Sequence, residues 1–95
     1  MSTQTYPIAK FRCGKIVSTP NALSQLSQED ILMAIGRHQA GDWGDMDEHD
    51  RQANERALIE HTRLWSVYHA ANGTKFWLIT EADRRSTAVL LPEDY

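Results

Sequence analysis

The 95-residue sequence contains one cysteine, three prolines, five glycines and no long apolar run. Because Cys13 is alone, an internal disulfide is excluded, and a reducing cytoplasm is the compartment that fits best. No apolar run approaches the ~20 residues that a membrane-spanning helix needs. The first twelve residues, MSTQTYPIAKFR, hold no apolar segment that could form the core of a signal peptide. We therefore expect a cytoplasmic protein without a membrane partner.

The sequence also lacks an excess of positive charge and any established catalytic motif. Its formal net charge is −3, so the chain as a whole has no electrostatic attraction for phosphate backbones, and we expect no direct binding of nucleic acid. The four histidines have no metal-site spacing, and no phosphate-binding loop, dinucleotide fingerprint or nucleophile elbow is present. We expect no catalytic residues, no cofactor and no metal ligands, although an enzyme is not excluded.

The first two thirds of the chain read as one strand followed by three helices. Strand-forming residues occupy positions 8–19, and Gly14 among them indicates a bulge or a close backbone approach. Thr19 followed by a proline, and later Ser27, are typical helix starts, and the second helix is expected to end near residue 41. Asp45 or Asp47 is expected to cap a third helix that runs to about residue 61.

The last third of the chain has the pattern of three strands. Positions 63–71 and 74–80 flank Asn72-Gly73, a strong hairpin signal, and a second turn at 82–85 leads to a strand at 86–91. We therefore predict a single α+β domain over residues 6–95, preceded by a disordered stretch at residues 1–5. The element order β-α-α-α-β-β-β predicts an antiparallel sheet of three to four strands, with two to three helices packed on one face.

Turn lengths predict how these strands face one another. A two-residue turn at Asn72-Gly73 would place Tyr68 opposite Trp77, and a four-residue second turn would place Trp77 opposite Leu90. One sheet face would then form the core, with Trp65, Val67, Phe76, Leu78, Val89 and Leu91. The other face would carry five further apolar residues, Leu64, Tyr68, Trp77, Ile79 and Leu90. That face is too apolar for a bare monomer surface, so we expect it to bind a protein partner or a second copy, or to be covered by a terminal segment of the chain.

Residues 42–60 are the acidic part of the chain. They hold seven acids and two arginines, a sum of −5, and five of the acids define a candidate acidic surface: Asp42, Asp45, Asp47, Glu48 and Asp50. These acids could be a solvated loop and helix start, a nucleic-acid mimic that binds a basic partner, or a weak cation site without the EF-hand pattern. Trp43 lies between Gly41 and Gly44 in this segment. It is expected to fill the gap between the second and third helices, with an exposed recognition role as the alternative.

Three segments together carry a family resemblance: FRCGKIVSTPNAL, HQAGDWGDMDEHDRQANERAL and FWLITEADRRSTAVLLPEDY. They resemble a group of small bacterial proteins labelled as plasmid-related, some of which carry a label linking them to type I restriction systems. The resemblance implies a bacterial mobile element and a cytoplasmic location, and it brings no established activity. We therefore expect a small non-enzymatic interaction protein or accessory factor of such an element. The alternatives are an acidic inhibitor of host defence that mimics nucleic acid, and a small metal-binding or hydrolytic domain.

Overall fold

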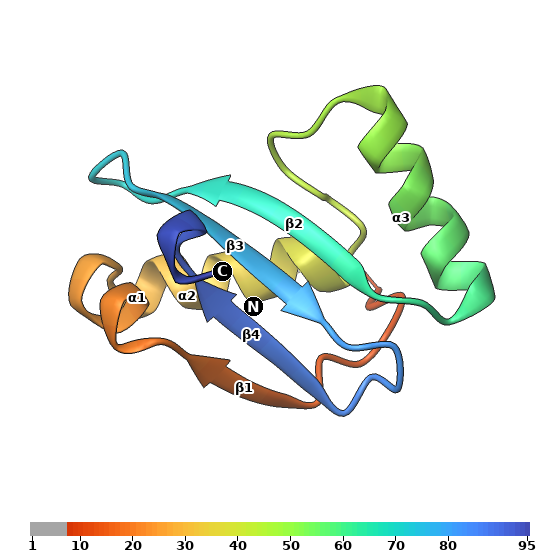
Figure 1. The fold of residues 1–95 in the computed structure, drawn as a ribbon, viewed down its shortest axis with the longest axis horizontal. Helices are drawn as coiled ribbons and strands as arrows, with labels where there is room; N and C mark the ends of the chain where they lie inside the picture. Colours follow the sequence, from red (N-terminus) through yellow and green to blue (C-terminus); the bar gives the residue numbers. More distant parts are fainter. Residues whose placement is uncertain (1–7) are drawn as a thin grey trace, which may run out of the picture.

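The computed structural model describes residues 8–95, and a four-stranded sheet lies at their centre (Figure 1). Its strands are β1 (Lys15–Ser18), β2 (Leu64–His69), β3 (Lys75–Thr80) and β4 (Ser86–Leu90), in the spatial order β1-β4-β3-β2. The predicted α+β class and element order are confirmed. The sheet is mixed, because β1 pairs parallel with β4 while the other neighbours pair antiparallel. The predicted disordered residues 1–5, and the first residues of the predicted domain, lie outside the described part.

Two helices cover one face of the sheet, as Figure 1 shows. They are α1 (Pro20–Gln25) and α2 (Gln28–Gln39), and both begin at the predicted caps. The Thr19 hydroxyl accepts the backbone N–H of Ala22, and Ser27 forms a reciprocal capping box with Asp30. The main core lies between these helices and the sheet, and its buried members are Ala22, Leu26, Ala34, Tyr68, Ala70, Phe76, Leu78, Val89 and Leu91.

The third helix, α3 (Glu48–Glu60), lies beside the sheet at the β2 edge instead of over its face (Figure 1). Of the two predicted caps, Asp47 is the correct one, since its carboxylate accepts the N–H of Asp50. The buried Asn54 side chain pairs with the backbone of Trp65: its Nδ2 donates to the carbonyl (2.7 Å) and its Oδ1 accepts the N–H (3.1 Å). The outward backbone groups of Trp65 therefore already have partners.

The hairpin between β2 and β3 has a three-residue loop where the sequence suggested two residues. Ala70 pairs with Thr74 by backbone hydrogen bonding, and Gly73 has a φ of +89°, as in a type I turn followed by a left-handed residue. The extra loop residue shifts the register by one, so Tyr68 lies opposite Phe76 and Val67 opposite Trp77. The predicted pairing of Tyr68 with Trp77 is therefore wrong. The four-residue second turn and the pairing of Trp77 with Leu90 are confirmed.

This shift exchanges the two faces of β2, because side chains alternate along a strand. Leu64 and Tyr68, predicted on the partner-binding face, are both buried, with 0% and 2% of their surface exposed: Tyr68 belongs to the main core, and Leu64 to a second cluster with Trp43 and Ala57. Trp65 and Val67, predicted in the core, share the opposite face with Trp77. The predicted faces of the β3 and β4 side chains are correct, because the second turn has the expected length.

The C-terminal segment lies on the side of the sheet that α1 and α2 leave free. After β4 the chain forms a short 3₁₀ helix, η1 (Pro92–Asp94), drawn in dark blue in front of the sheet in Figure 1. The Asp94 carboxylate accepts hydrogen bonds from the Thr19 hydroxyl (2.6 Å) and the Asn21 amide (2.7 Å). These bonds hold η1 against the start of α1. Among residues 8–95, no helix has the length and apolarity required to cross a membrane.

Candidate functional site

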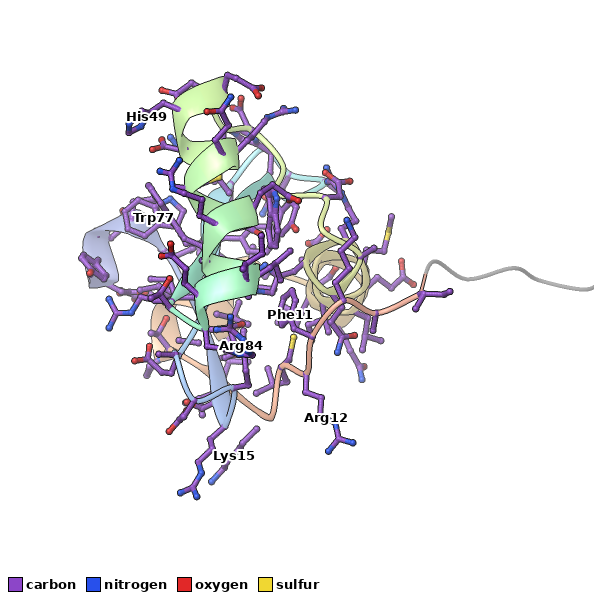
Figure 2. The ribbon with its side chains drawn as sticks, turned by 90° about the vertical axis from the view of Figure 1, so that its right-hand side faces the viewer. Phe11, Arg12, Lys15, His49, Trp77 and Arg84 are labelled. Atoms are coloured by element: carbon purple, nitrogen blue, oxygen red, sulfur yellow. The ribbon has the colours of Figure 1, made fainter. Side chains whose placement is uncertain are left out.

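The sheet face away from α1 and α2, here called the open face, carries the candidate site. Figure 2 shows Trp77 pointing to the side of the sheet opposite α2. Its ring meets Trp65 nearly at a right angle, with centroids 5.1 Å apart, and meets Tyr95 at 66° and 5.7 Å. Such edge-to-face pairs contribute about 0.5–1.5 kcal/mol beyond their area burial. The three rings therefore form one preorganised aromatic cluster.

These rings cover the smaller apolar side chains of the same face. Ile79 and Leu90 are only 7% and 6% exposed, although α1 and α2 lie on the other face of the sheet. Beside the rings is a cavity of about 190 Å³, lined by Arg63, Trp65, Trp77, Ile79 and Tyr95. The Arg63 guanidinium donates to the Tyr95 hydroxyl and to Glu81, so its position at the edge of the cavity is fixed. The open face is thus a shaped aromatic surface and not a flat aliphatic one.

Three of the five predicted residues, Trp77, Ile79 and Leu90, lie on the open face, and only Trp77 retains a substantial accessible surface. Sequence reasoning missed Trp65 and Tyr95. Trp65 was assigned to the core through the register error. Tyr95 follows a proline-containing turn, so strand alternation says nothing about its position. The expectation that a terminal segment partly covers this face agrees with the contact between Tyr95 and Trp77.

Two of the five residues of the predicted acidic surface, Asp42 and Asp47, are engaged in local structural contacts. Asp42 forms a salt bridge with Arg37 at 2.7 Å and accepts the N–H of Gly44, and these hydrogen bonds lower the pKa of its carboxyl. Asp47 caps α3, and Glu55 accepts the indole N–H of Trp43 at 2.8 Å. The remaining candidates, Asp45, Glu48 and Asp50, lie around the start of α3 and are exposed or half-buried. Negative charge near a helix start is also favoured by the helix dipole.

A small group of possible metal ligands lies at the same helix start. Oxygen or nitrogen atoms of Asp47, His49 and Asp50 lie within 4.8 Å of one another. Asp47 is already engaged as the helix cap, and His49 is exposed beyond it, as Figure 2 shows at the upper end of α3. Asp47 and His49 are exposed and Asp50 is half-buried, and a group of three such side chains is by itself no evidence of a bound metal.

A chain of buried polar side chains connects α2 with the sheet, and sequence reasoning did not predict it. His38 is completely buried; its Nδ1 lies 2.5 Å from the Ser66 hydroxyl, and its Nε2 lies 2.8 Å from the Thr80 hydroxyl. Thr80 in turn contacts the Thr87 hydroxyl at 2.6 Å. Thr87 donates to the carbonyl of Cys13 at 2.8 Å. All four side chains are thereby satisfied, as buried polar groups must be.

The hydrogen-bond directions along this chain follow from its last member. Because the Thr87 proton points to the Cys13 carbonyl, Thr80 must donate to Thr87, and the Thr80 oxygen must accept from Nε2 of His38. The Ser66 hydroxyl then donates to Nδ1, so His38 is neutral with its proton on Nε2. Burial of the ring, aided by the nearby positive charge of Arg84, lowers the pKa of His38 to about 4 from an ordinary 6.5.

Stability is therefore expected to fall between pH 6.5 and pH 4. The unfolded chain takes up a proton on His38 below pH 6.5 and the folded protein does not, so protonation favours unfolding over this interval, by about 3 kcal/mol in total. The carboxyl groups of Asp30, Asp42 and Asp94 have lowered pKa values, so they reduce stability only below about pH 4. Urea unfolding from pH 7 to pH 4 measures the loss.

The matched variant for this titration is His38→Gln, which keeps a side-chain donor but cannot be protonated. Its pH dependence between 7 and 4 should be nearly flat, whatever its absolute stability. An NMR titration of His38 in the wild-type protein gives a direct second reading. A His38 that titrates near pH 6.5 in the folded protein would contradict the buried neutral state.

The buried positions of the possible nucleophiles argue against catalysis by them. Ser66 and His38 are spaced like a nucleophile and its general base, but both are 0% exposed, so no substrate reaches them. Cys13 is also buried, and burial raises the pKa of its thiol. These side chains are part of the buried core of the protein.

The chain matches no model of a known protein family, no curated protein and no solved structure. Functional inference for this chain therefore rests on the chemistry of its own surfaces.

Proposed function

We propose that this chain is a non-enzymatic interaction protein, an accessory factor of a bacterial mobile element, that binds another protein through its open face. The observation that carries the proposal is the aromatic cluster of Trp65, Trp77 and Tyr95 beside a preformed cavity. Tryptophan, tyrosine and arginine are the residues most enriched at the centres of protein interfaces. Arg63, at the edge of this cavity, is a fourth residue of these types. The link to a mobile element rests on the resemblance of the sequence.

Two unpaired hydrogen-bond donors also support the binding of a partner at the open face. Among the described residues, the indole nitrogens of Trp65 and Trp77 are buried and have no acceptor. A buried donor without a partner costs about 1–3 kcal/mol, so its presence in a folded protein calls for an explanation. A partner that rearranges these rings and offers carbonyl or carboxylate oxygens would supply the missing acceptors. The open face accordingly fits a protein segment that combines an apolar side chain with exposed acceptors.

The acidic alternative, inhibition of host defence by mimicry of nucleic acid, has weaker support. A mimic must present its charges to the partner, whereas Asp42, Asp47 and Glu55 are engaged in contacts that hold the loop and α3 in place. If mimicry were the function, binding would weaken steeply with salt. Aromatic docking predicts only weak dependence on salt.

Capture of partners from a bacterial host lysate tests the proposal. Trp77→Glu places a charge at the centre of the cluster and should weaken capture of the specific partner by about thirtyfold or more, as expected for a hot-spot residue. Because Trp77 is half-buried, Tyr95→Glu serves as a second variant; Tyr95 is 75% exposed, so its replacement leaves the fold intact. Mass spectrometry of the captured proteins is the measurement.

The control is Ile59→Glu, which adds the same charge at an 80% exposed apolar residue on α3 that does not line the cavity of the open face. It should capture the partner as the wild type does. Equal capture by the wild type and by both open-face variants would overturn the proposal, as would a wild-type protein that captures no partner.

A further inference from the structure

The two edges of the sheet differ in a way that points to a second interface. At the β2 edge, Asn54 pairs with the backbone of Trp65, while the carbonyl of Trp43 and the N–H of Asp45 pair with Val67. At the β1 edge, no described element lies on the outer side of the strand (Figure 1). An exposed edge strand is a template for another strand unless a protein blocks it. Here one edge is blocked and the other is not.

The outward backbone groups of β1 can be identified from its pairing. Lys15 and Thr19 donate their N–H groups to Arg85 and Val89 on the β4 side. Since backbone groups alternate along a strand, those of Ile16 and Ser18 point away from the sheet. The strand has no proline and no bulge within it, so its protection against pairing is limited to its length of four residues and the single charge of Lys15.

An apolar groove continues from this edge onto the helix-covered side. It has a volume of about 510 Å³ and is lined by Ile16, Leu23, Leu26, Gln28, Ile31, Leu32 and Ile35. Leu23 and Leu32 project from its walls, with 61% and 60% of their surface exposed. No charged side chain lines the groove, so two copies of it can meet without repulsion. Projecting leucines beside a groove of the same chemistry make the surface complementary to itself.

We propose that the β1 edge and this groove bind a second copy of the chain, forming a two-fold dimer with one continuous eight-stranded sheet. With β1 antiparallel to its copy and the two-fold axis at Ile16, each Ile16 exchanges both backbone hydrogen bonds with the other, and Ser18 lies opposite Gly14. Residues opposite each other in antiparallel strands share a face, so the helices of both copies lie on one side and their grooves meet. The open face stays free, and this interface is therefore separate from the proposed function.

The charge distribution favours this edge over the other. The acidic segment, with its sum of −5, lies at the β2 edge around α3. Pairing at β1 keeps the two acidic segments at opposite ends of the joined sheet, whereas pairing at β2 would bring them together. Like charges at an interface suppress association, so the acidic segment disfavours pairing at β2 more than the single Lys15 disfavours pairing at β1.

Sedimentation equilibrium over a range of concentrations tests the dimer. The wild type should reach twice its chain mass of 10.8 kDa. Leu32→Lys, which places a charge in the groove, should weaken self-association at least about tenfold. Met33→Lys is the matched control, because Met33 is the next residue on α2, is 69% exposed and does not line the groove. It should dimerise as the wild type does.

Two further measurements separate this interface from its alternatives. Amide exchange of Ile16 and Ser18 should slow as the wild-type concentration rises, since dimerisation pairs those groups. Trp77→Glu should leave the dimer intact, whereas it should impair partner capture through the open face. A wild type that stays monomeric up to about millimolar concentration, or a dimer that persists in Leu32→Lys, would overturn the inference.

Discussion

Replacing Gly44 by alanine is expected to destabilise the protein by more than about 4 kcal/mol, which is most of the free energy of unfolding of a domain at the low end of the usual range. Gly44 has a φ of +80° and lies against β2, where the flanking Trp43 carbonyl and Asp45 N–H pair with Val67. A Cβ atom at position 44 would overlap the carbonyl oxygen of Val67 and lie 2.8 Å from a ring carbon of Tyr68. Both obstacles belong to the buried sheet, so neither can move away cheaply.

Two other glycines separate the causes of this loss. Gly73 has a similar φ of +89°, and a Cβ atom there meets nothing within 4 Å, so Gly73→Ala measures the conformational strain alone, about 1 kcal/mol. Gly36 lies within α2 with open space around it, so Gly36→Ala should stabilise the protein by about 0.5–1 kcal/mol. Circular dichroism and urea unfolding measure all three. A Gly44→Ala variant no less stable than Gly73→Ala would show that the loop does not approach β2 so closely.

The features that the sequence predicted correctly depend on neighbouring residues. Thr19 with its following proline, Ser27 and Asp47 each cap a helix through a hydrogen bond that spans only three residues. The close approach at Gly14 is of the same kind: its φ of +65° and its contact with the backbone of Arg85 require a residue without a side chain. Such local requirements are recorded directly in residue type and spacing.

The candidate site was predicted only in part, because β2 does not encode its own orientation. Its sequence LWSVYH places large apolar residues at both alternating sets of positions, so a shift of one residue leaves an equally plausible core. Only the loop length decides, and Asn-Gly is compatible with two or three residues. Polar residues would have identified the register: Ser66, Thr80 and Thr87 share a face in it, where Ser66 and Thr80 contact His38 and Thr87 contacts Thr80. No local sequence pattern predicts this chain of hydrogen bonds, because it joins α2 to three strands.

Replacing Trp43 by alanine is expected to cost about 3–5 kcal/mol, as large-to-small changes in a core do. The structure confirms that Trp43 fills the space near α2 and α3, since it is 4% exposed and belongs to a second core cluster with Ala57 and Leu64. Its ring stacks on Phe11 with centroids 6.1 Å apart and meets His38 edge-on at 5.7 Å. For a domain of this size the loss corresponds to a fall of roughly 15 °C or more in Tm.

Trp43→Phe divides this loss between packing and hydrogen bonding. Phenylalanine retains an aromatic ring between Phe11 and His38 but removes the N–H that Glu55 accepts, so it should cost about 1–2 kcal/mol. In Trp43→Ala, water gains access to the His38 ring, so the pKa of His38 should rise toward its ordinary value and the loss of stability below pH 6.5 should become smaller. Thermal and urea unfolding at pH 7 and pH 5 measure both effects. A loss below about 1 kcal/mol at pH 7 would contradict the core assignment and indicate a recognition role for Trp43.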